Sequence, residues 1–151
     1  MSAGRVSYPE FQREAAETYA AMVAFSRSAV AFGVDKGLTE LVKVRVSQIN
    51  GCAFCVAYHL KLARGLDVEA AKLDMLAVWR EAVSFTPAER AALAWAEDMA
   101  NMPNDLPSLD THKTLQQHFD HRQIIGLNIA LANINAWNRM AVAFGFSPAD
   151  A

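Results

Sequence analysis

Cysteine is scarce in this sequence, and Cys52 and Cys55 are the only two among 151 residues. A disulfide framework of the kind that supports small secreted domains is excluded, because a loop closed by residues three positions apart constrains the unfolded chain very little. The close spacing of the pair instead predicts redox chemistry or metal binding.

An excess of charge of one sign is also lacking. The 14 basic residues are scattered among 16 acidic ones, and the formal net charge is -2. No cationic stripe could neutralise a row of phosphates, so nucleic acid and anionic membrane are not expected as partners. Residues 1–13 have neither the apolar core of a signal peptide nor the length of a transmembrane span, which predicts a cytoplasmic protein.

Strand patterns are absent as well, since no stretch shows the sustained alternation of a half-buried strand. Helical periodicity along the chain predicts an all-α fold. The even composition predicts a single domain over residues 1–151. Apolar residues make up 53% of the sequence, above the roughly 45–50% that is typical. We expect the surplus to face other subunits, which predicts a homo-oligomer.

Turn and capping residues indicate where the helices begin and end. Asn50-Gly51 predicts a sharp turn, and Gly65 predicts a helix end in the left-handed conformation. Capping boxes are predicted at Thr86–Glu89 and Asp120–Gln123. The elements predicted in this way are helices at 11–32, Leu38–Ile49, Cys52–Gly65 and Val68–Ala77, a helix from Pro87, a loop at Asn101–Ser108, and a long central helix from His121.

One predicted helix face collects groups that could carry chemistry. In the helix that begins near Cys52, positions three, four and seven apart share a face, so Cys52, Cys55 and His59 point inward together. A thiol is a nucleophile only as the thiolate, and a helix N-terminus or a nearby base favours that form. Cys52 has the helix N-terminus, and Cys55 has His59 about one turn, ~5–6 Å, away.

Glu40 joins these groups if the Asn50-Gly51 turn folds its two helices into an antiparallel hairpin. Glu40 then lies ~15 Å along its helix from the turn, and His59 lies ~12 Å back along the other. The two side chains are therefore expected at nearly the same level. A carboxylate beside an imidazole orients it and increases its basicity, which suits His59 to take a proton from Cys55.

The same residues carry a resemblance to a known family. Glu40, Cys52, Cys55 and His59 have the spacing of the AhpD-like alkylhydroperoxidases of the carboxymuconolactone decarboxylase superfamily, and the chain resembles them from about Leu38 to Gly145, with its motif region at 38–65. The later Trp137-Asn138-Arg139 is also similar to the end of single-domain members. The resemblance implies an all-helical fold, a homotrimer or homohexamer, and reduction of organic peroxides through a thiol cycle.

Roles carried over by this resemblance divide the work between the cysteines. Cys55 is implied as the thiol that attacks the peroxide, and Cys52 as the resolving thiol that exchanges with a thiol reductant protein. Glu40 and His59 are implied as the proton relay, and no cofactor or metal ion is called for. Phe54 is a departure, because the best-known member has a second histidine there, and this bears on peroxidase strength more than on thiol chemistry.

Other readings of the same residues remain open. Cys52, Cys55, His59 and Glu40 would be four acceptable ligands for a zinc ion. A lactone decarboxylase or related non-redox enzyme is possible on the same fold, although that chemistry does not require a dithiol. A non-catalytic oligomeric protein with a redox-sensing disulfide is a third reading.

Several other polar residues are expected to have mainly structural roles. Lys43 and Arg45 could steer an anionic substrate, but we expect them on a solvated helix face. We expect the amides of Asn128, Asn135 and Asn138 to fix packing or subunit register.

Overall fold

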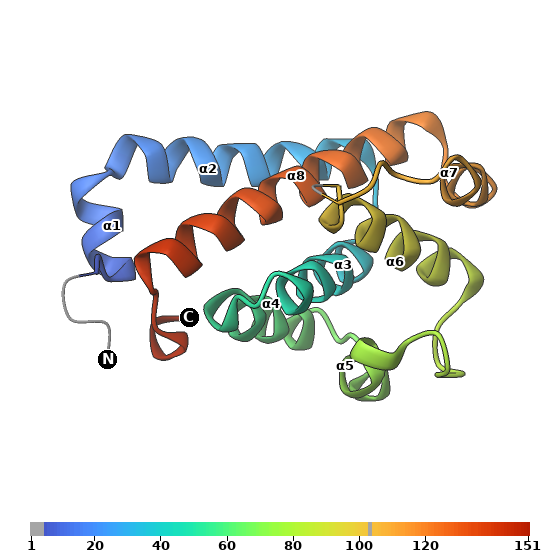
Figure 1. Ribbon diagram of the computed structural model, residues 1–151, viewed down its shortest axis with the longest axis horizontal. Helices are drawn as coiled ribbons and strands as arrows, with labels where there is room; N and C mark the ends of the chain where they lie inside the picture. The colour runs from blue at the N-terminus through green and yellow to red at the C-terminus, as the bar shows by residue number, and fades with distance from the viewer. Residues whose placement is uncertain (1–4, 103) are drawn as a thin grey trace.

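The computed structural model describes residues 5–102 and 104–151, and every regular element in these residues is helical (Figure 1). The prediction of an all-α fold is therefore confirmed. In chain order the elements are α1 (Tyr8–Glu14), α2 (Ala16–Ser28), the 3-10 helix η1 (Ala29–Phe32), α3 (Lys36–Ile49), α4 (Ala53–Gly65), α5 (Ala70–Met75), η2 (Leu76–Val78), α6 (Pro87–Ala100), α7 (Leu109–Gln116), α8 (His121–Phe144) and η3 (Pro148–Asp150).

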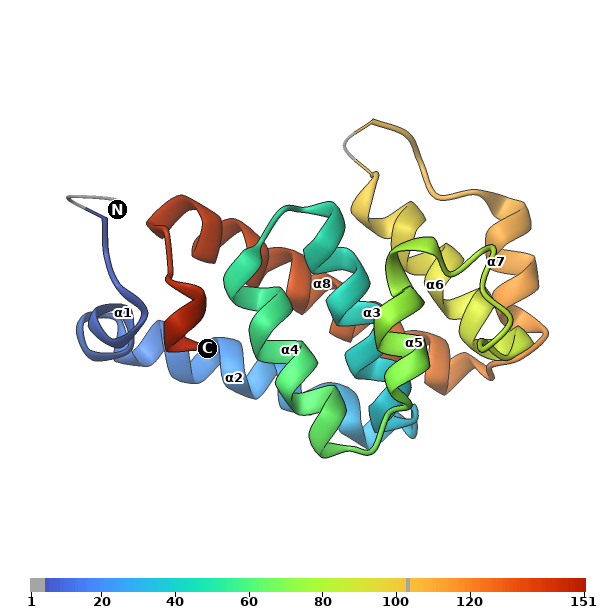
Figure 2. The same ribbon diagram turned by 90° about the horizontal axis from the view of Figure 1, so that it is seen from below.

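The predicted hairpin is formed by α3 and α4, which pack against each other along their lengths (Figure 2). Gly51 makes the turn between them with a φ of 68°, in the left-handed region that glycine adopts at no steric cost. Cys52 then occupies the N-cap position of α4, with extended backbone. The turn therefore places both cysteines at the very start of a helix, as the sequence predicts.

The helices α8 and α3 lie at the centre of the molecule. In Figure 1, α8 runs between α2 and the α3–α4 hairpin, and it contacts each of them. The helix α3 packs against α4, α6 and α8, so most of its circumference is buried. Polar side chains on α3 therefore lie inside the protein, where they need partners.

The two predicted capping boxes are confirmed, but the predicted left-handed helix end at Gly65 is wrong. Both predicted capping boxes are formed, at the starts of α6 and α8. Gly65, however, is the last residue of α4, and the left-handed residue after this helix is Asp67, with a φ of 57°. Aspartate tolerates this conformation better than most residues do. The N-cap of the next helix, α5, is Glu69.

Part of the predicted loop at Asn101–Ser108 is not described, because Pro103 lies outside the described residues. Across 5–102 and 104–151, no helix combines the length and the apolar composition that crossing a membrane requires.

Candidate active site

The two cysteines are bonded to each other at the beginning of α4, with their Cα atoms 5.3 Å apart. The Cys52 sulfur also accepts a hydrogen bond from the backbone N–H of Cys55, at 3.2 Å. This contact with an amide in the first turn of the helix favours negative charge on the sulfur of Cys52 when the disulfide is reduced.

The two cysteines are buried to the same degree. Each is only 2% exposed. The segment around η3 packs against α4, and Phe146 contacts Phe54 with ring centroids 5.4 Å apart. This tail of the chain covers the start of α4, and the covering could not be foreseen from α4 alone.

Glu40 and His59 meet across the hairpin, as their predicted levels require. Nδ1 of His59 lies 2.6 Å from Oε2 of Glu40, and both side chains are buried. An ionised carboxylate can only accept a hydrogen bond, so Nδ1 carries the hydrogen and Nε2 is left as the basic nitrogen. The contact therefore fixes the ring and selects the tautomer that can receive a proton from a neighbouring group.

Lys43 is a third ionisable group of this cluster, and the prediction that it lies on a solvated helix face is wrong. It is 6% exposed, and its Nζ lies 3.8 Å from Oε1 of Glu40 and donates to Oγ of Ser26 at 3.3 Å. Burial lowers the pKa of the Lys43 ammonium, and the Glu40 carboxylate partly opposes that effect. A signal was present, since Lys43 is three residues after Glu40 and so shares its helix face.

A cavity of about 730 Å³ gives access to these groups. Cys55, His59, Glu40 and Lys43 line it, whereas Cys52 is not among its described lining residues. Its walls come from α2, α3, α4 and α8. A pocket of this size holds a substrate of the size of a drug molecule.

Aromatic side chains make part of the cavity wall neutral and apolar. Tyr8, Phe54 and Tyr58 line it, and the rings of Tyr8 and Phe54 are 4.7 Å apart between centroids. Burial raises the pKa of Tyr8 and of Tyr58 above the usual value, so both phenols stay neutral at physiological pH. Phe54 therefore contributes apolar surface at the position between the cysteines.

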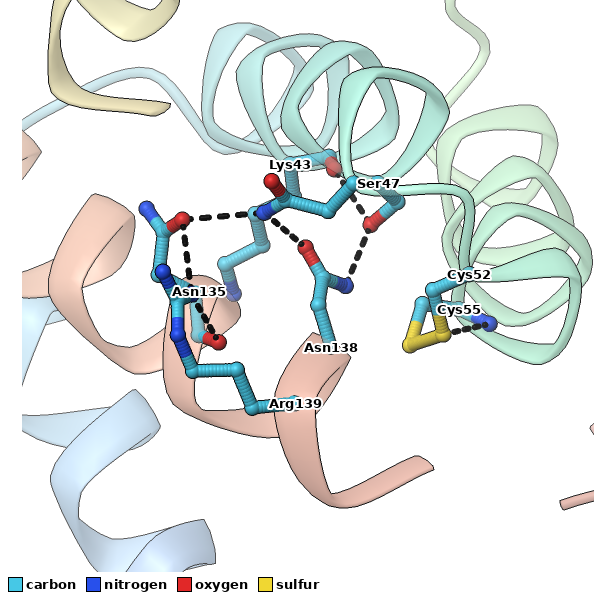
Figure 3. The surroundings of a disulfide bond; sticks show 8 residues. Lys43, Ser47, Cys52, Cys55, Asn135, Asn138 and Arg139 are labelled. Atoms are coloured by element: carbon cyan, nitrogen blue, oxygen red, sulfur yellow. Dashed lines mark hydrogen bonds between the residues drawn. A yellow bond between two sulfur atoms is a disulfide. The ribbon is translucent and has the colours of Figure 1, made fainter. Parts of the chain in front are cut away.

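A network of side-chain amides fastens the turn before Cys52 to α8 (Figure 3). The side-chain amide of Asn50 donates to the oxygens of both Asn135 and Asn138, at 2.9 Å each. Asn138 donates in turn to Oγ of Ser47 at 3.0 Å, and Ser47 donates to the backbone oxygen of Lys43. Asn135 and Asn138, two of the three amides expected to fix packing, therefore hold the disulfide's turn in place. Asn128, the third, accepts a hydrogen bond from Nε1 of Trp95 at 2.7 Å.

We expect Asn138→Ala to lower the free energy of unfolding by about 1–3 kcal/mol, because Asn50 and Ser47 lose a buried partner. Urea denaturation measures the change. The matched control is Asn104→Ala, at an exposed asparagine, which should stay within about 0.5 kcal/mol of the parent. Equal stability of the two variants would show that the network contributes nothing.

The zinc reading requires the two sulfurs, His59 and Glu40 to converge on one point. Within the described part of the chain, no group of three or more histidine, cysteine, aspartate or glutamate side chains is placed to hold a metal ion. His59 Nδ1 is directed at Glu40, and the sulfurs are directed at each other.

Arg45, the other cation expected on a solvated face, lies outside the cavity lining. It pairs with Glu97 of α6 at 2.9 Å.

Comparison with known proteins finds similarity to one family over more than half of the chain. Residues 16–98 match the model of the carboxymuconolactone decarboxylase family. The protein YdfG of Bacillus subtilis (strain 168) is 31% identical over 141 residues, which cover 93% of this chain and 94% of YdfG.

Solved structures share the arrangement of the helices. A protein from Agrobacterium tumefaciens, suggested to be the antioxidant defence protein AhpD, is 33% identical, with a TM-score of 0.84 over 89% of this chain and 92% of that one. The debrominase Bmp8 in its apo form is 20% identical, with a TM-score of 0.80 over 89% of this chain and 72% of that one. At this identity, the likeness to Bmp8 shows the fold alone.

Proposed function

This chain belongs to the carboxymuconolactone decarboxylase family, and we propose that within it the protein is a thiol-dependent peroxidase that reduces organic hydroperoxides. The observation that carries the proposal is a disulfide whose Cys55 lines the same cavity as the Glu40–His59 pair. A redox-active dithiol, a base and a substrate-sized cavity are the parts that such a reaction needs.

The first proposed step is attack by Cys55. Nε2 of His59 takes the thiol proton, and the thiolate sulfur then attacks the outer oxygen of the hydroperoxide. The O–O bond breaks, the alcohol leaves after taking up a proton, and Cys55 becomes a sulfenic acid. Glu40 stabilises the imidazolium that forms on His59 during this step.

The second and third steps restore the enzyme. The Cys52 thiol condenses with the sulfenic acid, releasing water and forming the disulfide. An external dithiol, on a thiol reductant protein, then attacks this disulfide through a mixed disulfide and becomes oxidised in its place. We propose that the external thiol attacks the sulfur of Cys52, because Cys55 faces the substrate cavity. The cycle also needs a reducing compartment such as the cytoplasm, where we propose that the protein acts.

Turnover of cumene hydroperoxide with dithiothreitol as the supplied dithiol tests the proposal. We expect peroxide loss that depends on protein concentration and matches dithiothreitol oxidation one to one. A non-redox decarboxylase-type enzyme, or a non-catalytic redox-sensing protein, would not sustain this turnover. Peroxide loss at the rate of buffer alone would contradict the proposed function.

Lys43 offers a test of the charge balance around the relay. Lys43→Met removes a cation that competes with the imidazolium of His59 for Glu40, so the thiolate–imidazolium pair should form more readily. We expect the pH profile of Cys55 alkylation, measured with iodoacetamide on the reduced protein, to move to lower pH. A profile that does not move would remove Lys43 from this balance.

Assembly into a homotrimer or homohexamer is a further part of the proposal. Large apolar side chains such as Val30, Val83 and Leu106 are exposed on the single chain, at 57%, 99% and 80%. Sedimentation velocity should therefore give an oligomer at micromolar concentration, because burial of such side chains stabilises association. A folded monomer under these conditions would contradict the prediction.

A further inference from the structure

The charged residues that line the cavity are nearly all cations. Arg27, Lys36, Lys43 and Lys61 line it, and Glu40 is the single carboxylate among the lining residues that the structure describes. The chain as a whole carries a net charge of -2, so this local excess of positive charge is a property of the cavity. A cavity lined by one sign of charge concentrates ligands of the opposite sign.

Helical spacing aims these cations at the cavity. On α3, Lys36 precedes Glu40 by four residues, which places the two on one face, one turn apart. On α4, Lys61 follows Tyr58 by three residues and so lies on the same helix face. Both residues line the cavity, as does Cys55 in the turn before them. Arg27, which also lines the cavity, lies in the last turn of α2.

The cations divide into a buried one at the floor and exposed ones at the mouth. Lys43 is buried with Glu40 and His59, whereas Arg27, Lys36 and Lys61 are exposed. None of the three exposed cations has an ion-pair partner within residues 5–102 and 104–151. They are therefore available to an anion that enters the cavity.

The carboxylate of Glu40 determines whether an anionic group of a substrate is favoured at the floor of the cavity or at its mouth. Lys43 at the floor already has Glu40 3.8 Å away, so a second carboxylate there would be repelled. The mouth has three cations and no described carboxylate, beside exposed apolar side chains such as Leu62. An anionic group is therefore favoured at the mouth, with the apolar body reaching inward.

We propose that the substrate is an amphipathic organic hydroperoxide that carries a carboxylate, held at the mouth by Arg27, Lys36 and Lys61 while its peroxide reaches Cys55. This inference rests on the proposed peroxidase function and adds the class of substrate. The chemical step is unchanged: sulfur is oxidised, the O–O bond breaks, and the hydroxy acid leaves.

The test compares linoleic acid hydroperoxide with its methyl ester, which keeps the chain and the peroxide and removes the charge. We expect kcat/KM for the acid to exceed that for the ester by about fivefold, as exposed ion pairs contribute. High salt should reduce the ratio, because the cations are solvent-exposed. Lys61→Glu should lower the ratio below one, whereas Lys113→Glu, the same charge change at an exposed site on α7, should keep the parent ratio.

A binding measurement separates this inference from the proposed function. Calorimetry with linoleate, which has no peroxide, should give a Kd that Lys61→Glu weakens and Lys113→Glu does not. Such binding without any hydroperoxide turnover would contradict the peroxidase and support the anionic ligand class. Turnover of both substrates with equal acid and ester rates, and the same ratio in both variants, would overturn the inference while the peroxidase stands.

Discussion

Cys55→Ser is expected to abolish hydroperoxide reduction, and Cys52→Ser is expected to allow a single round of it. Two arguments compete for the attacking thiol. The helix N-terminus favours Cys52, whose sulfur accepts a hydrogen bond from the backbone N–H of Cys55. The imidazole favours Cys55, since His59 is one turn from Cys55 and two turns, ~10 Å along the axis, from Cys52. The cavity favours Cys55, because Cys55 lines it with His59 whereas Cys52 is not among its described lining residues.

Mass spectrometry after one equivalent of cumene hydroperoxide measures this division of labour. Cys52→Ser should carry a sulfenic acid on Cys55, trapped with dimedone, and should not turn over with dithiothreitol. Cys55→Ser should carry none. Each variant is the control for the other, because both remove one thiol from the same helix start. Oxidation that occurs only at Cys52 would reverse the assignment.

The second large effect is expected for Glu40→Gln. The glutamine keeps the size of the side chain but removes the charge that stabilises the imidazolium of His59, so proton transfer from Cys55 becomes harder. We expect kcat/KM for hydroperoxide near neutral pH to fall about 10²-fold, at the lower end of what a positioned acid–base group contributes. The pH profile of thiol alkylation should move to higher pH, opposite to that of Lys43→Met.

A control variant separates this effect from a general loss of negative charge. Glu69→Gln makes the same change at a side chain that is 68% exposed and stands apart from the cavity. It should keep the parent alkylation profile. If Glu40→Gln and Glu69→Gln behave alike, Glu40 has no part in the relay.

The hairpin and its Glu40–His59 contact could be predicted because they depend on local geometry. A glycine turn and the fixed rise of a helix determine which levels meet across two adjacent helices. The 2.6 Å contact follows from these two quantities and from the inward direction of both side chains. The all-α fold class likewise follows from the helical spacing of apolar residues, which can be read directly from the sequence. The single domain over residues 1–151 stays a prediction.

What depends on distant segments could not be predicted in the same way. The periodicity of α3 does not reveal that α4, α6 and α8 surround it, so the burial of Lys43 was missed. The segment that packs against the start of α4 comes from η3, far along the chain, and the cavity wall includes α2 and α8. Such packing depends on how helices meet, which no single segment encodes.

The most direct test of the central claim is a single reaction of the fully reduced protein with one equivalent of cumene hydroperoxide and no external reductant. Peroxide consumed, thiols lost and the peptide map are measured on the same sample. We predict that one peroxide is consumed for each chain, that both thiols disappear, and that the only new linkage joins Cys52 to Cys55. Unreacted peroxide beside two intact thiols would contradict the account.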